Sequence, residues 1–390
     1  MRNEKVVFLC PSFSTYWVQI FDAFHSRLGG NFTVITQSFN DAFNARVAQT
    51  MGAFHRKIIL GFRLSLSARK PEAGLGTPFG LNIAPFLPWT LRRLAPRVVI
   101  ANNFGVWALA ALLMRYPTVI FWEGTEHTER TVQPWRKRLR IWMAQKAGAF
   151  VVNGTSAREY LVETLGVAQD RVFVGSLCCE PPPSGIGDSR RQNDNPARPR
   201  NILFVGRLIK GKGVDHLLHA AAQLRLMAPK DEAIFRVTVV GDGPERNTLE
   251  SLAEDLEIRD LVTFTGAVHP HEIWAYYGNA DIFVLPTLHD NWPLVVLEAM
   301  SVGLPVLLSS YAGSLPDLVH HGVNGYGFEP DDHHALAMLI RGYIENSEKI
   351  VDHGTNSLNI SMQYSPERAV NAFMNAATLA QRDADFLAET

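Results

Sequence analysis

Cysteine is scarce in this sequence of 390 residues, which contains only three. Cys178 and Cys179 are neighbours in the chain, and adjacent cysteines rarely bond to each other. No CxxC pair and no His-rich metal spacing occurs. The sequence therefore predicts neither a disulfide framework nor a metal site, and a reducing, cytoplasmic setting is the simplest interpretation.

Long apolar runs are also lacking. No stretch of about 18 apolar residues occurs, so no membrane-spanning helix is predicted. The first apolar run, residues 5–10, ends at Pro11 and is too short for the core of a secretory signal. With 47% hydrophobic and 19% charged residues, the composition is that of a globular protein and excludes a disordered chain.

Net charge is nearly absent, at −1, but the charges are unevenly distributed. Residues 1–180 carry 21 Lys and Arg against 11 Asp and Glu, a net of +10. Residues 181–390 carry 16 against 27, a net of −11. This division favours an anionic partner for the first half alone, with ordinary drift of surface charge as the alternative.

Short apolar, β-branched runs alternate with helical patterns, and this alternation is typical of parallel sheets with crossover helices. The length predicts two domains. We therefore expect an α/β fold of two doubly wound parallel-sheet domains, with one cleft between them. The predicted strands are 5–10, 32–36, 97–101, 118–122 and 149–153 in the first half, and 201–205, 236–240, 261–265, 281–285 and 304–308 in the second.

The domain boundary is predicted from a segment rich in Pro, Gly, Asp, Asn and Arg. The N-terminal domain is expected over 1–182, a linker over 183–200 and the C-terminal domain over 201–365. The segment 366–390, with Pro366 near its start, predicts a helix. We expect it to pack back toward the N-terminal domain, and an edge helix of the second domain is the alternative.

The stretch FVGRLIKGKG, residues 204–213, follows a predicted strand and precedes a helix that begins at Val214. Gly206 allows a sharp turn, so that Arg207 lies at the carboxyl end of the strand, where α/β sheets bind ligands. Arg207 and Lys212 together suit the negative charges of a diphosphate. The spacing is not that of a P-loop, and a glycine-rich turn with solvated basic residues is the alternative.

The segment DIFVLPTLHDNWPLVVLEAM predicts a strand, a loop with Asp290 and Asn291, and a helix that begins at Pro293. The first helical N–H groups, at Leu294 and Val295, are then free to bind an anion, which the helix dipole also attracts. This arrangement predicts an anion site directly after the strand.

Glu298 lies within that helix, eight residues after Asp290 and among apolar neighbours. An apolar helix is expected to be buried, so a carboxylate within it needs a specific partner. Because two carboxylates would repel phosphates, we infer that they accept hydrogen bonds from sugar and ribose hydroxyls. For Glu298 alone, a solvated helix glutamate is the alternative.

These motifs, together with the turn VVGDGPE (239–245) and the later stretch YAGSLPDLVHHGVNGYGFEP (311–330), resemble the retaining glycosyltransferases of family 4. The resemblance runs from about Asn201 to Pro330, and the combination is far more specific than any one motif. It implies the GT-B fold, in which two Rossmann-like domains face a central cleft. It also implies a donor site in the C-terminal domain and an acceptor site in the N-terminal one.

By position, the resemblance assigns the donor's diphosphate to Arg207 and Lys212, its ribose hydroxyls to Glu298, and its sugar to Asp290. The family pattern has glutamate where this chain has Asp290, and Phe-Gly where it has Trp292-Pro293. Aspartate is one methylene shorter and proline lacks an N–H, so the sugar end of the site departs from the pattern. The remaining expected donor-binding residues are Gly206, Val268 near the nucleobase, Asn291, Pro293, Leu294 and Val295.

In the N-terminal half the resemblance is looser. Family members have a histidine near the reacting sugar carbon, and in this chain Glu123 stands at about that place, with His127 four residues later. Either is a candidate for the reaction centre, and a His127 that caps a helix or faces water is the alternative. A polar group after the first strand, expected to contact the acceptor or phosphate, comprises Ser12, Ser14, Thr15 and Tyr16.

A basic, aromatic stretch, 134–146 (PWRKRLRIWMAQK), suits adsorption to an anionic membrane. The expected membrane contacts are Arg136, Lys137, Arg138 and Arg140, with further basic residues within 55–70. The alternative is a helix whose apolar side lies in the core and whose basic side is solvated. A membrane contact would favour a lipid-linked acceptor and a peripheral position on the inner face of the plasma membrane.

The predicted function is transfer of a hexose or N-acetylhexosamine from a UDP- or GDP-sugar to a glycan or lipid-linked hydroxyl, in cell-surface polysaccharide or glycolipid biosynthesis. Neither a cofactor nor a metal is expected, because Arg207, Lys212 and helix N–H groups would stabilise the leaving diphosphate. A sugar-nucleotide epimerase of the same fold and a non-catalytic binding protein are the alternatives. Nucleic-acid binding is disfavoured because no recognised module occurs.

Overall fold

The computed structural model describes residues 5–14, 16–38, 54–65, 80–175, 177–186, 198–227 and 234–389. These residues form two compact units. Unit 1 contains the described residues up to Cys178 and those from Tyr364 onward, and unit 2 contains those from Cys179 to Gln363. Thr15 and most of the expected linker lie outside the described residues, as do the basic positions 69 and 70.

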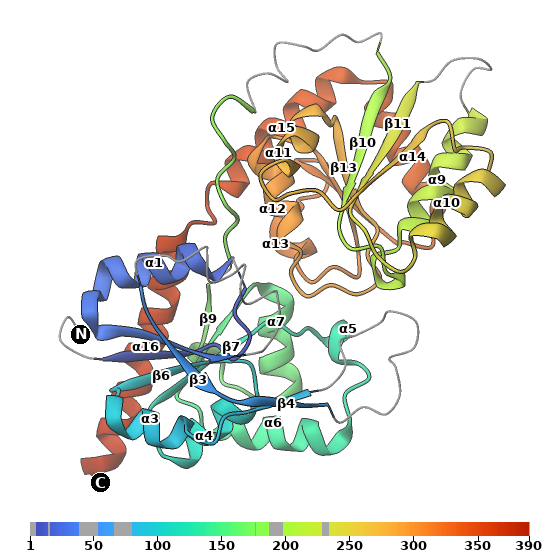
Figure 1. Ribbon diagram of the computed structural model, residues 1–390. Coiled ribbons are helices and arrows are strands. Elements are labelled where there is room, and N and C mark those ends of the chain that lie inside the picture. Colours follow the sequence, from blue (N-terminus) through green and yellow to red (C-terminus); the bar gives the residue numbers. More distant parts are fainter. Residues whose placement is uncertain are drawn as a thin grey trace. The chain divides into compact units, whose positions relative to one another are not determined.

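Unit 1 is built on a seven-stranded sheet with the order β3-β2-β1-β6-β7-β8-β9 (Figure 1). Neighbouring strands pair in parallel throughout. The strands are β1 (Val6–Leu9), β2 (Phe32–Ser38), β3 (His55–Leu60), β6 (Val98–Asn102), β7 (Thr118–Trp122), β8 (Ala149–Val152) and β9 (Val172–Val174), beside an antiparallel pair of β4 (Phe62–Ser65) and β5 (Gly80–Ile83).

The helices of unit 1 cover both faces of this sheet, as a parallel sheet of buried apolar strands requires. They are α1 (Trp17–Leu28), α3 (Leu87–Leu94), α4 (Val106–Leu113), α5 (Glu126–Glu129), α6 (Pro134–Lys146), α7 (Thr155–Glu159) with a π-helical turn (Tyr160–Thr164), and α16 (Pro366–Glu389).

The C-terminal helix α16 packs on the sheet of unit 1, where it contacts β6, β7, β8, β9 and the neighbouring α1 (Figure 1). Its Phe373 is fully buried. The Phe373 ring lies 5.6 Å from the rings of Phe8 on β1, Phe24 on α1 and Phe121 on β7. A layer of aromatic rings thus joins the last helix of the chain to its first strand and first helix.

Unit 2 is built on a six-stranded parallel sheet with the order β12-β11-β10-β13-β14-β15. In Figure 1, α9, α10 and α14 lie on one side of this sheet and α11, α12 and α15 on the other. The strands are β10 (Arg200–Val205), β11 (Phe235–Val240), β12 (Val262–Gly266), β13 (Ile282–Leu285), β14 (Val306–Ser309) and β15 (Gly325–Phe328). The helices are α9 (Val214–Met227), α10 (Arg246–Asp255), α11 (Ile273–Asn279), α12 (Leu294–Ser301), α13 (Leu315–Leu318), α14 (His333–Ile344) and α15 (Ser347–Ser361).

The strand order reverses once in each sheet, between β1 and β6 in unit 1 and between β10 and β13 in unit 2. Helices leave the two strands toward opposite faces at such a switch point, and open α/β sheets bind ligands there, at the carboxyl ends of the strands. The loops that follow β10 and β13 carry Arg207, Lys212 and Asp290. These three predicted donor residues therefore lie at the switch point of unit 2.

The α/β fold of two Rossmann-like parallel-sheet units is confirmed. Each predicted strand is present within two residues of its expected bounds, and the helices expected at Val214 and over 366–390 are also present. The strands β3, β4, β5, β9 and β15 were not predicted. The charged sequence of β3 and the two glycines of β15 hide the apolar pattern that marks a buried strand.

We expect the Phe373→Ala substitution to lower the free energy of unfolding of unit 1 by about 3–4 kcal/mol, because it leaves a cavity in the aromatic layer. Urea denaturation followed by tryptophan fluorescence would measure the change. Phe386→Ala on the same helix is the matched control, since Phe386 is 67% exposed. Equal stability of the two variants would contradict the packing role of Phe373.

Candidate functional site

The loops after β10 and β13 are joined at a single carbonyl group in unit 2. The Gly211 oxygen accepts hydrogen bonds from the Thr287 hydroxyl at 2.9 Å and from the backbone N–H groups of Leu288 at 2.9 Å and His289 at 3.2 Å. Because three donors from one loop share this oxygen, the two loops are held together at the switch point.

Two glycines, Gly213 and Gly241, allow backbone segments of unit 2 to pack closely against each other. Gly213 has φ of +65°, and a Cβ there would lie 2.1 Å from the Pro286 carbonyl oxygen. Gly241, with φ of +137°, would place a Cβ 1.9 Å from the Gly206 carbonyl oxygen. Side chains at either position would need a strained backbone and would clash with a neighbouring loop. The glycine after Lys212 therefore serves the packing of the two loops.

Lys212 and Asp290, 78 residues apart, form an ion pair between the Lys212 Nζ and the Asp290 Oδ2. The two side chains are only 21% and 14% exposed. A third loop, after β14, fixes the same point, because the Gly313 N–H donates to the Asp290 carbonyl oxygen at 2.9 Å. The structure thus brings together two residues that the sequence assigned to different ends of the donor.

Arg207 follows β10 directly and is exposed. The backbone around it is held to the loop after β11, because the Leu208 N–H donates to the Asp242 carbonyl oxygen and the Leu208 carbonyl accepts from the Glu245 N–H, both at 3.0 Å. Within the described part of the chain, no ion pair neutralises the Arg207 guanidinium. Its charge is therefore available at the carboxyl end of the sheet.

Helix α12 begins at Leu294, one residue later than predicted, with Pro293 as its N-cap. The N–H groups of Leu294 and Val295 lie in the first helical turn, where no preceding turn supplies a carbonyl acceptor. Just before the helix, the Asn291 Oδ1 is buried and has no hydrogen-bond partner among the described residues. A buried acceptor without a partner is uncommon, and a ligand that donates hydrogen bonds would satisfy it.

Glu298 has the specific partner that its apolar helix demands, the hydroxyl of Tyr277 on α11. The Tyr277 hydroxyl donates to the Glu298 Oε2 at 2.6 Å. Burial raises the pKa of Glu298 above its ordinary value, and the Tyr277 hydrogen bond partly offsets this rise. Sequence reasoning inferred that a partner must exist but missed Tyr277, because no sequence pattern links it to Glu298.

In unit 1, Tyr16 and Glu123 lie near each other at the carboxyl ends of β1 and β7. The Asn153 amide donates to the Glu123 Oε1 at 2.9 Å. Burial raises the pKa of Tyr16, and the Glu123 charge raises it further. Burial also raises the pKa of the Cys10 thiol to about 12. Tyr16, Glu123 and Asn153 therefore form one polar group.

His127 lies on the short helix α5, half-buried, and its carbonyl oxygen accepts a hydrogen bond from Arg130. The cap of this helix is Thr125, whose hydroxyl accepts from the Thr128 N–H at 3.2 Å, while the Thr128 hydroxyl accepts from the Thr125 N–H at 2.9 Å. The capping role considered for His127 thus belongs to Thr125. Ser12 is exposed.

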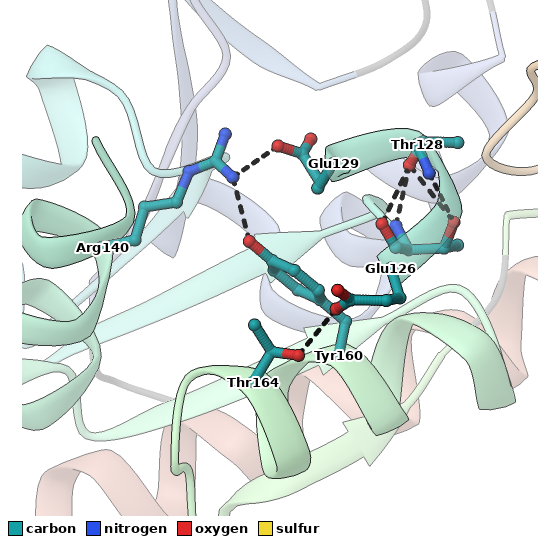
Figure 2. A network of polar contacts seen from close by, with 7 residues as sticks. Glu126, Thr128, Glu129, Arg140, Tyr160 and Thr164 are labelled. Atoms are coloured by element: carbon teal, nitrogen blue, oxygen red, sulfur yellow. Dashed lines mark hydrogen bonds and ion pairs between the residues drawn. The ribbon is translucent and has the colours of Figure 1, made fainter. Parts of the chain in front are cut away.

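The prediction that Arg140 contacts a membrane is wrong, because this side chain is only 7% exposed and lies inside unit 1. Figure 2 shows its guanidinium pointing at Glu129 on α5 and at the Tyr160 hydroxyl, at 2.5 Å and 3.2 Å. Its Cζ also lies 4.6 Å from the centroid of the Trp122 ring. A residue with these partners ties α6 to α5 and the sheet, and it is not free to meet a membrane.

The outward face of α6 is aromatic and basic. Trp135, Leu139 and Trp142 are 54%, 37% and 38% exposed, and the exposed Arg138 and Lys146 lie beside them. Spacings of three and four residues place these side chains on one face of the helix. Of the expected contacts, Arg136 and Lys137 are half-buried. The exposed face of α6 therefore combines apolar and basic side chains.

Two kinds of feature are absent from the described ranges. No group of three or more His, Cys, Asp and Glu side chains there is placed to hold a metal ion. No helix there is both long and apolar enough to cross a membrane.

The two Rossmann-like units, each with polar groups at the carboxyl ends of its strands, define a protein of the GT-B type. Two family profiles match the chain, "Glycosyltransferase Family 4" over residues 14–175 and "Glycosyl transferases group 1" over residues 186–358. Between them they cover both halves of the sequence. The chain belongs to the glycosyltransferases of this group 1 and family 4 type.

Sequence relatives of the chain match it over part of their length. An uncharacterized glycosyltransferase of Methanocaldococcus jannaschii is 32% identical over 157 residues, 38% of this chain and 39% of that protein. The amylovoran biosynthesis glycosyltransferase AmsK of Erwinia amylovora is 30% identical over 182 residues, 45% of this chain and 42% of that protein. The chain thus spans about two fifths of the length of these relatives.

Solved structures share the fold over nearly the whole chain. HepE of Anabaena in complex with UDP aligns with a TM-score of 0.71 at 20% identity, covering 99% of this chain and 100% of that chain. TarM aligns with a TM-score of 0.70 at 11% identity, covering 96% and 99%. At these identities the likeness shows the fold.

We expect Arg140→Ala to lower the free energy of unfolding of unit 1 by roughly 3 kcal/mol, because it leaves Glu129 without its partner in a largely buried site. Thermal and urea unfolding would measure the loss. Arg138→Ala removes an exposed arginine from the same helix and should change stability by less than about 0.5 kcal/mol. Equal effects would contradict the structural role assigned to Arg140.

Proposed function

We propose that the chain transfers a hexose or N-acetylhexosamine from a UDP- or GDP-sugar to a hydroxyl of a glycan or lipid-linked glycan acceptor, with retention of anomeric configuration and without a metal ion. The observation that carries this proposal is the meeting of Lys212, Asp290 and the start of α12 at the switch point of unit 2. The name of the relative AmsK supports a place in polysaccharide biosynthesis.

The diphosphate of the donor is assigned to Arg207, Lys212 and the N–H groups of Leu294 and Val295. When the bond between the sugar carbon and the diphosphate oxygen breaks, its electron pair goes to that oxygen. Positive side chains and a helix N-terminus stabilise the charge that develops there. The exposed guanidinium of Arg207 and the partly buried ammonium of Lys212 supply two such charges from one loop.

The sugar and ribose of the donor are assigned to the acidic and amide groups beside the diphosphate. Asp290 is proposed to face the sugar, and the buried Asn291 Oδ1 is a further acceptor for a sugar hydroxyl. Glu298 is assigned to the ribose hydroxyls, and the loop after β12, at Val268, to the nucleobase. Solved structures of HepE with UDP and with UDP-glucose support a uridine nucleotide as the first donor to test.

The acceptor is assigned to unit 1, to the polar group at the carboxyl ends of its strands. Tyr16 and Glu123 lie within electrostatic reach of each other there, which supports Glu123 as the polar group near the reaction centre. His127 remains the second candidate, and Ser12 and Ser14 complete the proposed contacts. Substitution of these residues should change the transfer rate to the acceptor and leave the affinity for the donor unchanged.

We expect Arg207→Ala to weaken binding of UDP-glucose or GDP-mannose by about tenfold or more, because a charge-assisted hydrogen bond is lost. Isothermal titration calorimetry with a panel of nucleotide sugars would measure it. The melting temperature should not change, since Arg207 is exposed.

Lys210→Ala is the matched control, because Lys210 is an exposed lysine of the same loop. Its affinity should stay within about twofold of the wild-type value, as expected for a distant surface charge. If the Arg207 variant binds nucleotide sugars with the affinity of the wild type, the proposed donor site is wrong. Conversion of the donor sugar without any acceptor would instead favour an epimerase.

We also propose that unit 1 adsorbs to an anionic membrane through the outward face of α6, in the manner of an interfacial helix. Trp135, Leu139 and Trp142 supply the apolar contact, and Arg138 and Lys146 supply the positive charge. A position on the inner face of the plasma membrane and a lipid-linked acceptor would both suit such a contact. The net charge of +10 on residues 1–180 supports an anionic surface as the partner.

The double substitution Trp135→Ala and Trp142→Ala should reduce the fraction bound to phosphatidylglycerol vesicles by about tenfold, since it removes most of the apolar contact. Vesicle flotation would measure it, with phosphatidylcholine vesicles as the uncharged comparison. Phe386→Ala, which removes an exposed aromatic ring from another helix of unit 1, is the control. Equal binding to charged and uncharged vesicles would contradict the electrostatic part of the proposal.

A further inference from the structure

Tyr277 lies at the centre of the packing between α11 and the sheet of unit 2. It is fully buried. Its ring centroid lies 5.7 Å from that of Trp274 on the same helix and 6.1 Å from that of Phe283 on β13. Aromatic contacts on two sides fix the plane of the ring, and therefore the direction in which its hydroxyl points.

The Tyr277 hydroxyl points at the helix that carries the proposed donor contacts. It lies 2.6 Å from the Glu298 Oε2 and 3.4 Å from the Val295 carbonyl oxygen, one turn earlier on α12. A hydroxyl that donates to a carboxylate at this distance forms a charge-assisted hydrogen bond, which is stronger than a neutral one. The bond fixes the orientation of the Glu298 side chain, because the ring that donates it cannot move.

We propose that Tyr277 is a positioning residue, which holds the Glu298 carboxylate in the orientation that receives the ribose hydroxyls of the donor. The inference rests on the proposed donor-binding role of Glu298. Because the Tyr277 hydroxyl occupies Oε2, the second carboxylate oxygen, Oε1, is the one left for a ligand. A carboxylate held by a rigid donor binds its ligand with less loss of side-chain freedom than a mobile one.

The charges around this pair agree with a donor at Tyr277 and an acceptor at Glu298. Burial first, and the Glu298 charge second, raise the pKa of Tyr277 well above its ordinary value, so the hydroxyl keeps its proton. For Glu298, burial raises the pKa, the Tyr277 hydrogen bond lowers it, and Glu180 raises it again. Cys179 faces Tyr277 from the same segment as Glu180.

The sign of the pH dependence follows from these contributions. A ribose hydroxyl donates to an ionised Glu298, so nucleotide affinity should fall as the pH drops through the pKa of Glu298. Removal of the Tyr277 hydroxyl takes away the contribution that lowers this pKa. In Tyr277→Phe the loss of affinity on acidification should therefore begin at a higher pH than in the wild type.

The experiment compares the full-length wild type with Tyr277→Phe, Glu298→Gln and Tyr276→Phe, the last being a neighbouring tyrosine of α11 as matched control. Three probes are titrated by calorimetry or by competition, from about pH 5 to 8. They are UDP (GDP if UDP does not bind), the 2′,3′-dideoxy form of the same nucleotide, and inorganic pyrophosphate. Titration of the phosphate itself is common to all the proteins and cancels in their comparison.

Tyr277→Phe should weaken UDP binding about tenfold at neutral pH and leave pyrophosphate binding as in the wild type, because pyrophosphate has no ribose. It should weaken binding of the dideoxy nucleotide much less than binding of UDP, so that the hydroxyl groups of protein and ligand are coupled. A tyrosine with only a packing role would change all three probes alike and would not move the pH profile.

The failure of this inference is distinguishable from failure of the proposed function. If Glu298→Gln binds UDP as the wild type does, the assigned role of Glu298 fails and the inference falls with it. If Glu298→Gln loses affinity while Tyr277→Phe matches Tyr276→Phe in affinity and pH profile, the donor site stands and the positioning role of Tyr277 is overturned. Equal weakening of UDP and pyrophosphate by Tyr277→Phe would also overturn it.

Discussion

The pairing of β10 with β13 is the constraint on which the candidate donor site depends. Ile202 lies opposite Ile282 in this register, and the loops that follow the two strands emerge side by side. The Gly211 carbonyl then binds three donors of the second loop, which fixes the distance between the loops. Lys212 and Asp290 can form an ion pair only because this pairing makes neighbours of two segments 78 residues apart.

Desolvation decides what each charged side chain can do. Lys212, Glu298 and Arg140 are all largely withdrawn from water, and each has a partner that offsets the cost. The partner of Arg140 ties it to the structure of unit 1, whereas those of Lys212 and Glu298 lie beside the start of α12. Arg207 is exposed and needs no such partner, so its charge is the one most available to a ligand.

Unit 1 has its own long-range constraint, the layer of aromatic rings that holds α16 on its sheet. Phe373 reaches rings on the first strand and the first helix, so the two ends of the chain close one core. The same sheet orders the loops at its carboxyl end, where Tyr16 and Glu123 are neighbours. Its outer helix α6 turns Trp135 and Trp142 to solvent and Arg140 inward.

The sequence by itself determined most of the strands, the starts of α9 and α16, the loops that carry Arg207, Lys212 and Asp290, and the helix that carries Glu298. These follow from apolar periodicity, glycine turns and helix signals, which act over a few residues. It also implied that a carboxylate on an apolar helix needs a partner. Only the tertiary structure decided that this partner is Tyr277, that Asp290 pairs with Lys212 and that Arg140 is buried. Those outcomes depend on which segments the sheets and helices bring together, and no local pattern encodes contacts between side chains so distant in the chain.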